Sequence, residues 1–170
     1  MTLPIGRWRT LRQIEMTKGW YPFYIYKLST MSVHESQQLS VDTSFRTERD
    51  DDRVTTFGRF LRRTSIDELP QFLNVLNGEM SIVGPRPLEA QEASHMKQVL
   101  TRYMVRHYVL PGITGWAQIN GYRGSTRETA LMQKRIDLDN WYVSNWTLGL
   151  DLQIILITVF KILFRDSNAY

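Results

Sequence analysis

The sequence contains no cysteine and no long hydrophobic run, and each absence excludes a class of protein. Without cysteine there is no disulfide scaffold, no thiolate zinc site and no cysteine nucleophile. The three histidines, His34, His95 and His107, are too scattered to form a metal site at helical spacing. Because no stretch of about 18 uncharged apolar residues occurs, we expect no ordinary membrane-spanning helix.

The remaining composition is typical of one globular domain. The chain has 170 residues, of which 42% are hydrophobic and 22% charged, so it can bury a core and is not disordered as a whole. Lys and Arg number 21 against 17 Asp and Glu, a formal charge of +4. This moderately basic balance suits phosphate-rich ligands, nucleic acid or an anionic membrane surface. Since the chain has no recognisable nucleic-acid motif, we expect no nucleic-acid partner.

Hydrophobic periodicity predicts the α+β class, mostly helical with short strands. The predicted helices cover residues 54–63, 70 to a stop at Gly78, 88–108, about 125–145, and 146–164. The predicted strands cover residues 21–27, 80–83 and 116–120. Residues 29–52 are predicted to form a loop and residues 110–115 a turn.

The last predicted helix has an unusually wide apolar surface. Its polar residues Asp151, Thr158, Lys161 and Arg165 are spaced so that they form one narrow stripe. Such a helix is either buried in a core or lies in a membrane interface. A domain of this size has little room to surround it, so we favour the second interpretation and expect an amphipathic membrane-interface helix.

Ser65-Ile-Asp67-Glu68 has two interpretations. Ser followed three residues later by Glu is a capping box, and acids are ordinary at a helix N-terminus. Alternatively, Asp67 and Glu68 form a paired carboxylate site. Adjacent helical positions diverge by about 100°, which suits two different roles. One carboxylate would attack an electrophile, while the other would hold a divalent cation such as Mg2+.

Basic residues in restrained positions favour the carboxylate site. Arg62 lies five residues before Asp67, Arg86 is flanked by prolines, Arg123 lies in a glycine-flanked turn, and Lys27 ends a predicted strand. Alone, each arginine is ordinarily a surface charge. Together they would neutralise the phosphoryl oxygens that otherwise repel an attacking carboxylate. The combination indicates phosphoryl transfer.

Three segments resemble the bacterial sugar transferases, the monotopic polyprenyl-phosphate hexose-1-phosphate transferases. They are Lys27 in Tyr-Ile-Tyr-Lys, residues 58–87 from Gly-Arg-Phe-Leu-Arg-Arg to Gly-Pro-Arg-Pro, and residues 111–123 from Pro-Gly-Ile-Thr-Gly-Trp to Gly-Tyr-Arg. The tail from Arg135 through Asp151 to Tyr170 is similar too. The resemblance covers about residues 21–170, which we take as the catalytic domain, with residues 1–20 an atypical N-terminal segment.

The resemblance implies a transfer of sugar-1-phosphate from a UDP-sugar to undecaprenyl phosphate at the cytoplasmic face of the bacterial inner membrane. This step starts exopolysaccharide, O-antigen and glycan assembly. Asp67 matches the family's nucleophile, which forms a covalent phosphosugar, and Glu68 matches its Mg2+ ligand. The remaining matched residues are the basic positions near the phosphates, Lys27, Arg62, Arg86 and Arg123, and a supporting acid, Asp151.

Two departures from the family define an alternative. The N-terminal re-entrant hairpin of the family is absent from residues 1–20, and the arginine that usually follows the lysine is missing from Leu28-Ser29-Thr30-Met31. The alternative is a truncated, non-catalytic, membrane-associated remnant of the family. The intact Asp67–Glu68 pair favours the enzyme.

Overall fold

The computed structural model describes residues 8–11, 23–31, 53–88, 93, 96–97, 100, 102–123 and 129–164. Its α-helices are α1 (Thr56–Thr64), α2 (Gln71–Leu76), the four-residue α4 (Trp116–Ile119), α5 (Thr129–Ser144) and α6 (Leu148–Phe164). Its 3-10 helices are η2 (Ile66–Glu68) and η3 (Tyr103–Tyr108). The predicted α+β class, mostly helical with short strands, is confirmed.

The described strands form two separate pairs. Strands β1 (Trp8–Leu11) and β2 (Ile25–Leu28) are antiparallel, with Trp8 opposite Leu28. Strands β3 (Ser81–Val83) and β4 (Gly112–Thr114) are parallel, with Val83 opposite Thr114. The predicted strand at 80–83 is confirmed, and the one at 21–27 is confirmed in its second half. Strand β1 lies within the N-terminal segment and joins it to β2.

Three local predictions are wrong. Residues 116–119 form helix α4 rather than a strand, and the strand lies at 112–114, where a turn was expected. Pairing with β3 overrides the local turn signals there, because tertiary contacts decide such short segments. The predicted helix over 88–108 does not continue to its end. Arg102 has a φ of 58°, and a 3-10 helix follows it.

The remaining helix predictions hold within narrow limits. Helix α1 begins two residues after its predicted start and is capped by Thr55, whose hydroxyl accepts from the Gly58 N–H at 2.9 Å. Gly78 has a φ of 74°, which fits the predicted end of the helix before it. The predicted start of the helix at about residue 125 and most of the predicted loop at 29–52 lie outside the described residues.

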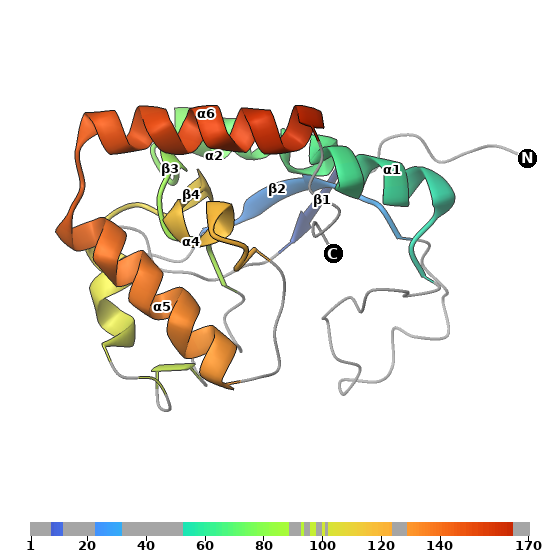
Figure 1. Cartoon of the computed structure of the whole chain (residues 1–170). Coiled ribbons are helices and arrows are strands. Elements are labelled where there is room, and N and C mark those ends of the chain that lie inside the picture. Colours follow the sequence, from blue (N-terminus) through green and yellow to red (C-terminus); the bar gives the residue numbers. More distant parts are fainter. Residues whose placement is uncertain are drawn as a thin grey trace, which may run out of the picture.

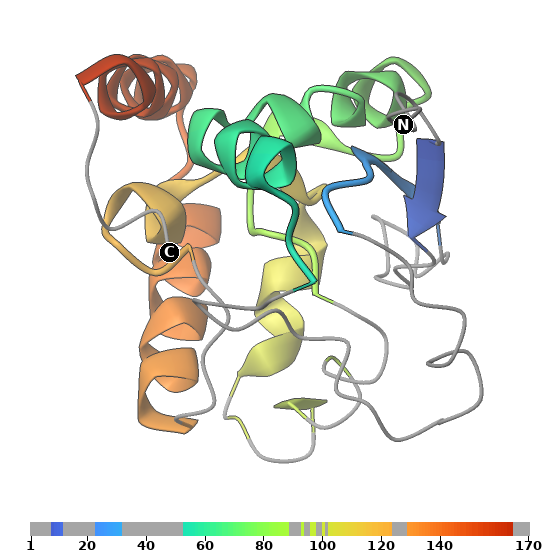
Figure 2. The ribbon, with the colours of Figure 1, turned by 90° about the vertical axis from the view of Figure 1, so that its right-hand side faces the viewer.

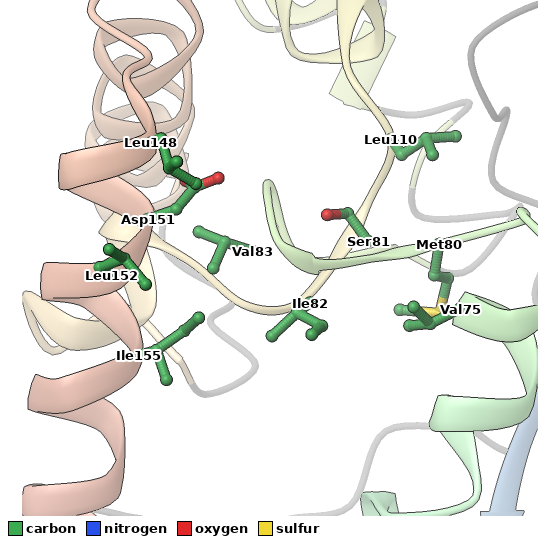
Figure 3. A pocket seen from close by; sticks show the side chains of 10 residues that line it. All are labelled: Val75, Met80, Ser81, Ile82, Val83, Leu110, Leu148, Asp151, Leu152 and Ile155. Atoms are coloured by element: carbon green, nitrogen blue, oxygen red, sulfur yellow. The ribbon is translucent and has the colours of Figure 1, made fainter.

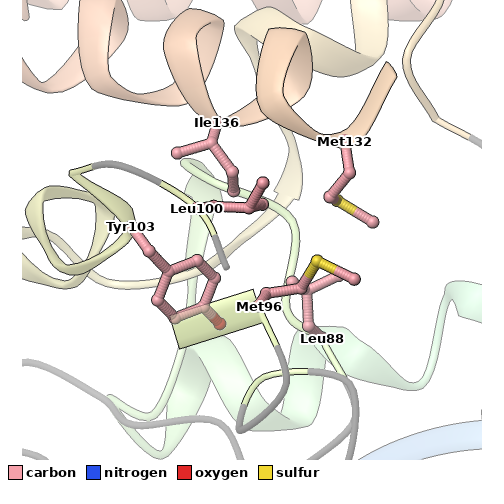
Figure 4. Packing of buried hydrophobic residues seen from close by; sticks show 6 residues of the cluster. All are labelled: Leu88, Met96, Leu100, Tyr103, Met132 and Ile136. Atoms are coloured by element: carbon pink, nitrogen blue, oxygen red, sulfur yellow. The ribbon is translucent and has the colours of Figure 1, made fainter. Parts of the chain in front are cut away.

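Helices α1, α2 and α6 lie along one side of the molecule, and α5 with η3 lies on the other (Figure 1). The view turned by 90° shows the same separation (Figure 2). Between these layers are the strands β3 and β4. A hydrophobic cluster joins α5 to the chain before it (Figure 4); its members are Leu88, Met96, Leu100, Tyr103, Met132 and Ile136.

The side formed by α1, α2 and α6 is covered with exposed hydrophobic side chains. The chief members of this apolar face are Phe57, Phe60, Leu69, Phe72, Leu73, Leu76, Leu152, Leu156, Phe160 and Leu163. In α2 the buried side chains are instead the polar Gln71 and Asn74. The apolar residues Phe72, Leu73 and Leu76 of this helix therefore face outwards.

The described part of the polar stripe predicted on α6 faces the body of the domain, and Arg165 lies outside the described residues. The Thr158 hydroxyl lies 2.7 Å from that of Thr114, and the Lys161 ammonium donates to the Ile119 carbonyl at 2.9 Å. Helix α6 is thus attached through these polar groups and through Ile154, which is buried against Val83 and Tyr142, while its exposed apolar residues, such as Leu152, Leu156 and Phe160, point away from the domain. Among the described residues, no helix is both long and apolar enough to cross a membrane.

Candidate functional site

Glu68 binds three of the basic side chains that the sequence singled out. Its Oε1 accepts from Lys27 Nζ at 3.1 Å and from Arg86 Nη2 at 2.7 Å. Its Oε2 accepts from Arg123 Nη2 at 3.0 Å and from Arg86 Nη1 at 3.4 Å. Since a carboxylate offers about four acceptor positions, those of Glu68 are filled.

Separate elements bring these cations together. Lys27 lies on β2, Arg86 follows β3, and Arg123 follows α4. Each side chain retains some exposure, between 19% and 30%, whereas the Glu68 side chain is only 8% exposed. The Glu68 carboxylate is therefore buried beneath the three cations, whose side chains are partly exposed to solvent. We call Lys27, Arg86, Arg123 and Glu68 the cation cluster.

Asp67 has the opposite environment to its neighbour. No hydrogen bond or ion pair reaches its carboxylate from the described part of the chain, although the residue is buried. Burial and the charge of Glu68 raise the pKa of Asp67 above its ordinary value, while Lys27 and Arg123 oppose this. Burial also disfavours ionised Glu68, but Arg86, Lys27 and Arg123 outweigh it and hold the pKa of Glu68 well below its ordinary range. Asp67 is therefore the carboxylate with oxygens available for chemistry.

The acid pair lies in a short 3-10 helix between α1 and α2. Ser65, which precedes it, adopts a left-handed conformation with a φ of 57°, and its side chain makes no capping bond. The capping-box alternative for residues 65–68 is therefore not formed. The left-handed turn ends α1 and redirects the chain so that Asp67 and Glu68 both point into the domain.

Arg62 reaches the site without entering the cation cluster. It lies in the last turn of α1, and its Nε donates to the Thr30 hydroxyl at 2.8 Å. Its charge acts on Asp67 and opposes the rise of that carboxyl's pKa. Helix α1 also approaches Thr30 closely at Gly58, where a Cβ atom would collide with the Thr30 carbonyl group. The end of β2 and helix α1 thereby fix Arg62 beside Asp67.

The charges of the site suit a diphosphate. Four cations, Lys27, Arg62, Arg86 and Arg123, face two carboxylates, a net charge of +2 when all are ionised. No group of three or more acidic or histidine side chains among the described residues could hold a metal alone. Mg2+ is, however, commonly bound by one or two carboxylates together with substrate phosphates, and the adjacent acids fit that mode. Glu68 as a metal ligand stays a prediction.

The structure places Asp151 in a different cluster. Its Oδ1 accepts from the Tyr142 hydroxyl at 2.7 Å and its Oδ2 from the Trp146 indole at 3.0 Å. Among the described residues, no hydrogen bond or ion pair joins Asp151 to the acid pair. It lines an apolar hollow of about 350 Å³ between α6 and β3, together with Val83 and Leu152 (Figure 3). Its contacts connect α5 to the start of α6.

Several buried polar residues were not predicted as part of the site. Arg106, Arg135 and Asp139 form a buried charged group behind Arg86. The only sequence signal for them is that Arg135 and Asp139 are four residues apart on one helix. His107 packs edge-on against Tyr103, and burial, with Arg106 and Lys97 nearby, lowers the pKa of His107 to about 4. It is neutral at physiological pH.

Comparison with known proteins supports the resemblance. The family model described as bacterial sugar transferase matches residues 9–165. A UDP-glucose:undecaprenyl-phosphate glucose-1-phosphate transferase from Xanthomonas campestris pv. campestris is 48% identical over 94% of this chain and 32% of its own length. The protein of the same name from Escherichia coli K12 is 47% identical over 88% of this chain and 31% of its own.

A shorter relative matches almost the whole of this chain. The uncharacterized sugar transferase EpsL from Bacillus subtilis strain 168 is 42% identical over 97% of this chain and 75% of its own length. The chain thus spans about a third of the first two relatives and three quarters of this one.

Proposed function

This chain belongs to the bacterial sugar transferase family, and on that premise we propose that it transfers a sugar-1-phosphate from a UDP-sugar to undecaprenyl phosphate. One observation carries the proposal: Glu68 gathers three cations, while the Asp67 carboxylate beside it has no polar partner among the described residues. This division of roles suits an attacking carboxylate next to a bound diphosphate.

In the proposed first step, an oxygen of Asp67 attacks the phosphorus that bears the sugar. A bond forms between that oxygen and phosphorus, and the phosphorus–oxygen bond to UMP breaks, so UMP leaves with the electron pair. In the second step, a phosphate oxygen of the lipid attacks the same phosphorus. The bond to Asp67 then breaks and the carboxylate is restored. The sugar–oxygen bond stays intact throughout, so the anomeric configuration is retained.

The cations perform the electrostatic part of this reaction. Lys27, Arg86 and Arg123 retain exposed surface above Glu68, so their remaining N–H groups can donate to the phosphate oxygens of the donor. Arg62 lies close enough to Asp67 to act on its ionisation. Removing one such donor to developing charge typically costs about 10²- to 10³-fold in rate.

Mg2+ is the proposed cofactor. When bound by Glu68 and phosphate oxygens, it would withdraw negative charge from the phosphoryl group. Because the acceptor positions of Glu68 are filled by cations, a metal contact there would replace at least one of them. Chain groups alone keep Asp67 in place, since it lies on a short helix between two docked helices.

We also propose that the apolar face lies on the cytoplasmic face of the bacterial inner membrane. Two features support this placement. Large hydrophobic residues of α1, α2 and α6 are exposed, and these three helices lie on the same side of the domain. The polar stripe of α6 is used for attachment to the domain, so its apolar side is left to face lipid. The acceptor, a lipid phosphate, would be presented at the same surface.

The covalent intermediate provides the test. UDP-glucose is the first donor to use, since two relatives carry glucose in their names. Incubation with UDP-glucose and Mg2+ without lipid acceptor is expected to release one UMP per active site and to leave a glucose phosphate on Asp67. Intact-protein mass spectrometry of the quenched reaction, followed by peptide mapping, measures both.

Asp67→Asn is expected to abolish the adduct and the UMP, because an amide oxygen is a much weaker nucleophile. The matched control is Asp137→Asn on the exposed side of α5, which should behave like the unaltered chain. If no UDP-hexose gives an adduct, yet the chain binds liposomes, the non-catalytic alternative replaces this proposal. If Asp67→Asn still forms product, Asp67 is not the nucleophile.

A further inference from the structure

Three charged residues are almost completely buried on the far side of Arg86 from the acid pair. Arg106 lies on η3, and Arg135 and Asp139 lie one turn apart on α5. An ion pair of 3.2 Å joins Arg106 Nη2 to Asp139 Oδ2, with side chains only 1% and 2% exposed. Burial raises the pKa of Asp139, against the opposing charges of Arg106 and Arg135. Burying charged side chains this completely costs desolvation free energy, so the presence of these three residues in the interior requires an explanation.

Both arginines donate to one backbone atom, the carbonyl oxygen of Arg86. Arg106 Nη2 makes a short hydrogen bond to it, and Arg135 Nη2 donates at 3.3 Å. The preceding carbonyl, that of Pro85, accepts from the Gly112 N–H at 2.9 Å. Since the flanking prolines restrict their own φ angles, the backbone on both sides of Arg86 is tightly restrained.

We propose that Arg106 and Arg135, with Asp139 as their shared counterion, are positioning residues that hold the Arg86 guanidinium against Glu68. The Arg86 side chain extends from this restrained backbone to Glu68, where Nη2 and Oε1 are 2.7 Å apart. Two charged donors on one carbonyl limit its displacement more than a single neutral bond would. The catalytic consequence of this inference rests on the proposed function, because Arg86 is one of its phosphate-binding groups.

Packing alone does not explain these charges. On the same helix, Met132 and Ile136 fill the interior with apolar side chains (Figure 4). Apolar residues often replace buried ion pairs without loss of stability. What apolar residues cannot supply is a hydrogen bond to the Arg86 carbonyl. The arrangement therefore suits positioning of the 85–87 segment rather than stability.

Arginine side-chain NMR tests this inference independently of activity. In the full chain with 15N-labelled arginine, Arg86→Lys assigns the Arg86 Nε–H signal. Arg135→Met is expected to move that signal towards the value of a solvated arginine and to speed its exchange with water. Arg135→Lys keeps a cation but loses the planar fork, so it should cause a smaller change in the same direction. Lys134→Met, at the exposed neighbouring position, is the control and should change nothing.

A double-mutant cycle supplies the second readout, the rate of UMP release from UDP-glucose. Arg135→Met is expected to lower this rate by about 10- to 10²-fold, the usual consequence of a small misplacement near the reacting groups. In an Arg86→Ala background the same substitution should cause no further loss, because its effect passes through Arg86. A merely structural role predicts that the two losses multiply.

The two proposals fail separately. An Arg86 signal that is unchanged in both Arg135→Met and Arg135→Lys overturns the positioning role, whatever the activity. If Arg135→Met does not fold, the Arg135→Lys signal decides. If the unaltered chain releases no UMP from any UDP-hexose, the proposed function is wrong, and the NMR measurement still decides whether Arg135 holds Arg86.

Discussion

Replacing Gly58 with alanine tests how α1 is held over the acid pair. Gly58 lies in the first turn of α1, where the helix crosses Thr30. A Cβ atom there would come within 2.7 Å of the Thr30 carbonyl carbon, and closer still to its oxygen. Ordinary contacts begin at 3.4 Å, so the helix would have to retreat by at least about 0.7 Å.

The expected cost follows from the contacts at Thr30. Overpacking of this kind costs about 1–3 kcal/mol. Retreat of α1 also weakens two hydrogen bonds, from the Thr55 N–H to the Thr30 carbonyl at 3.1 Å and from Arg62 Nε to its hydroxyl at 2.8 Å, each worth about 1 kcal/mol. Alanine regains about 0.5–1 kcal/mol over glycine inside a helix. With both hydrogen bonds lost, we therefore expect a net loss of about 2–4.5 kcal/mol in the free energy of unfolding.

Urea unfolding followed by tryptophan fluorescence measures this loss. Gly149→Ala in α6 is the matched control, because the nearest atom to its new Cβ would be Thr147 Oγ1 at 3.9 Å. That variant should gain about 0.5–1 kcal/mol. If Gly58→Ala proves as stable as Gly149→Ala, close approach to Thr30 does not hold α1, and Arg62 is not fixed beside Asp67 in this way.

Two further predictions concern the apolar face and acid stability. The double variant Leu156→Lys and Phe160→Lys should release the chain from anionic liposomes in a flotation assay, because both side chains are exposed on α6. The control Leu131→Lys, on α5, should leave liposome binding unchanged. Equal binding by all variants would exclude the apolar face as the membrane contact. The pKa of His107 is lowered from an ordinary value of 6.5 to about 4 in the fold, so the unfolded chain binds a proton first and stability falls as the pH drops from 6.5 towards 4. Between pH 7 and pH 5 the loss in the free energy of unfolding amounts to about 2 kcal/mol, and His107→Gln should remove it in urea titrations. If the pH dependence is the same in this variant, the fold does not lower the pKa of His107.

Local patterns predicted the helix before the acid pair and the strand before Arg86. Helix α1 and strand β3 appear close to where periodicity put them, and the prolines around Arg86 correctly indicated a restrained backbone. Their partners could not be predicted in the same way. Glu68 meets Arg86, Lys27 and Arg123 across 18, 41 and 55 residues of sequence. Such pairing depends on tertiary packing, which spacing along the chain does not encode.

Helix α2 shows why periodicity could not assign the buried side. Asn74 faces inwards because its amide donates to the Tyr24 carbonyl at 2.6 Å and accepts from the Tyr26 N–H at 3.1 Å. It thereby satisfies backbone groups next to and within β2. Periodicity reports that a helix has an apolar side, but not whether that side meets a core or another medium. The strand misplaced to 116–120 has a related cause, since four-residue elements carry too little pattern.

The acid pair is close in sequence to the apolar face, and this closeness has a kinetic consequence. Leu69, two residues after Asp67, is 54% exposed. On the proposed membrane contact, the attacking carboxylate lies within one helical turn of the lipid boundary. A lipid phosphate would then reach it by diffusing sideways, with its hydrocarbon tail never leaving the bilayer. Encounter becomes a two-dimensional search, and its frequency follows the surface density of the lipid rather than its amount per volume of solution.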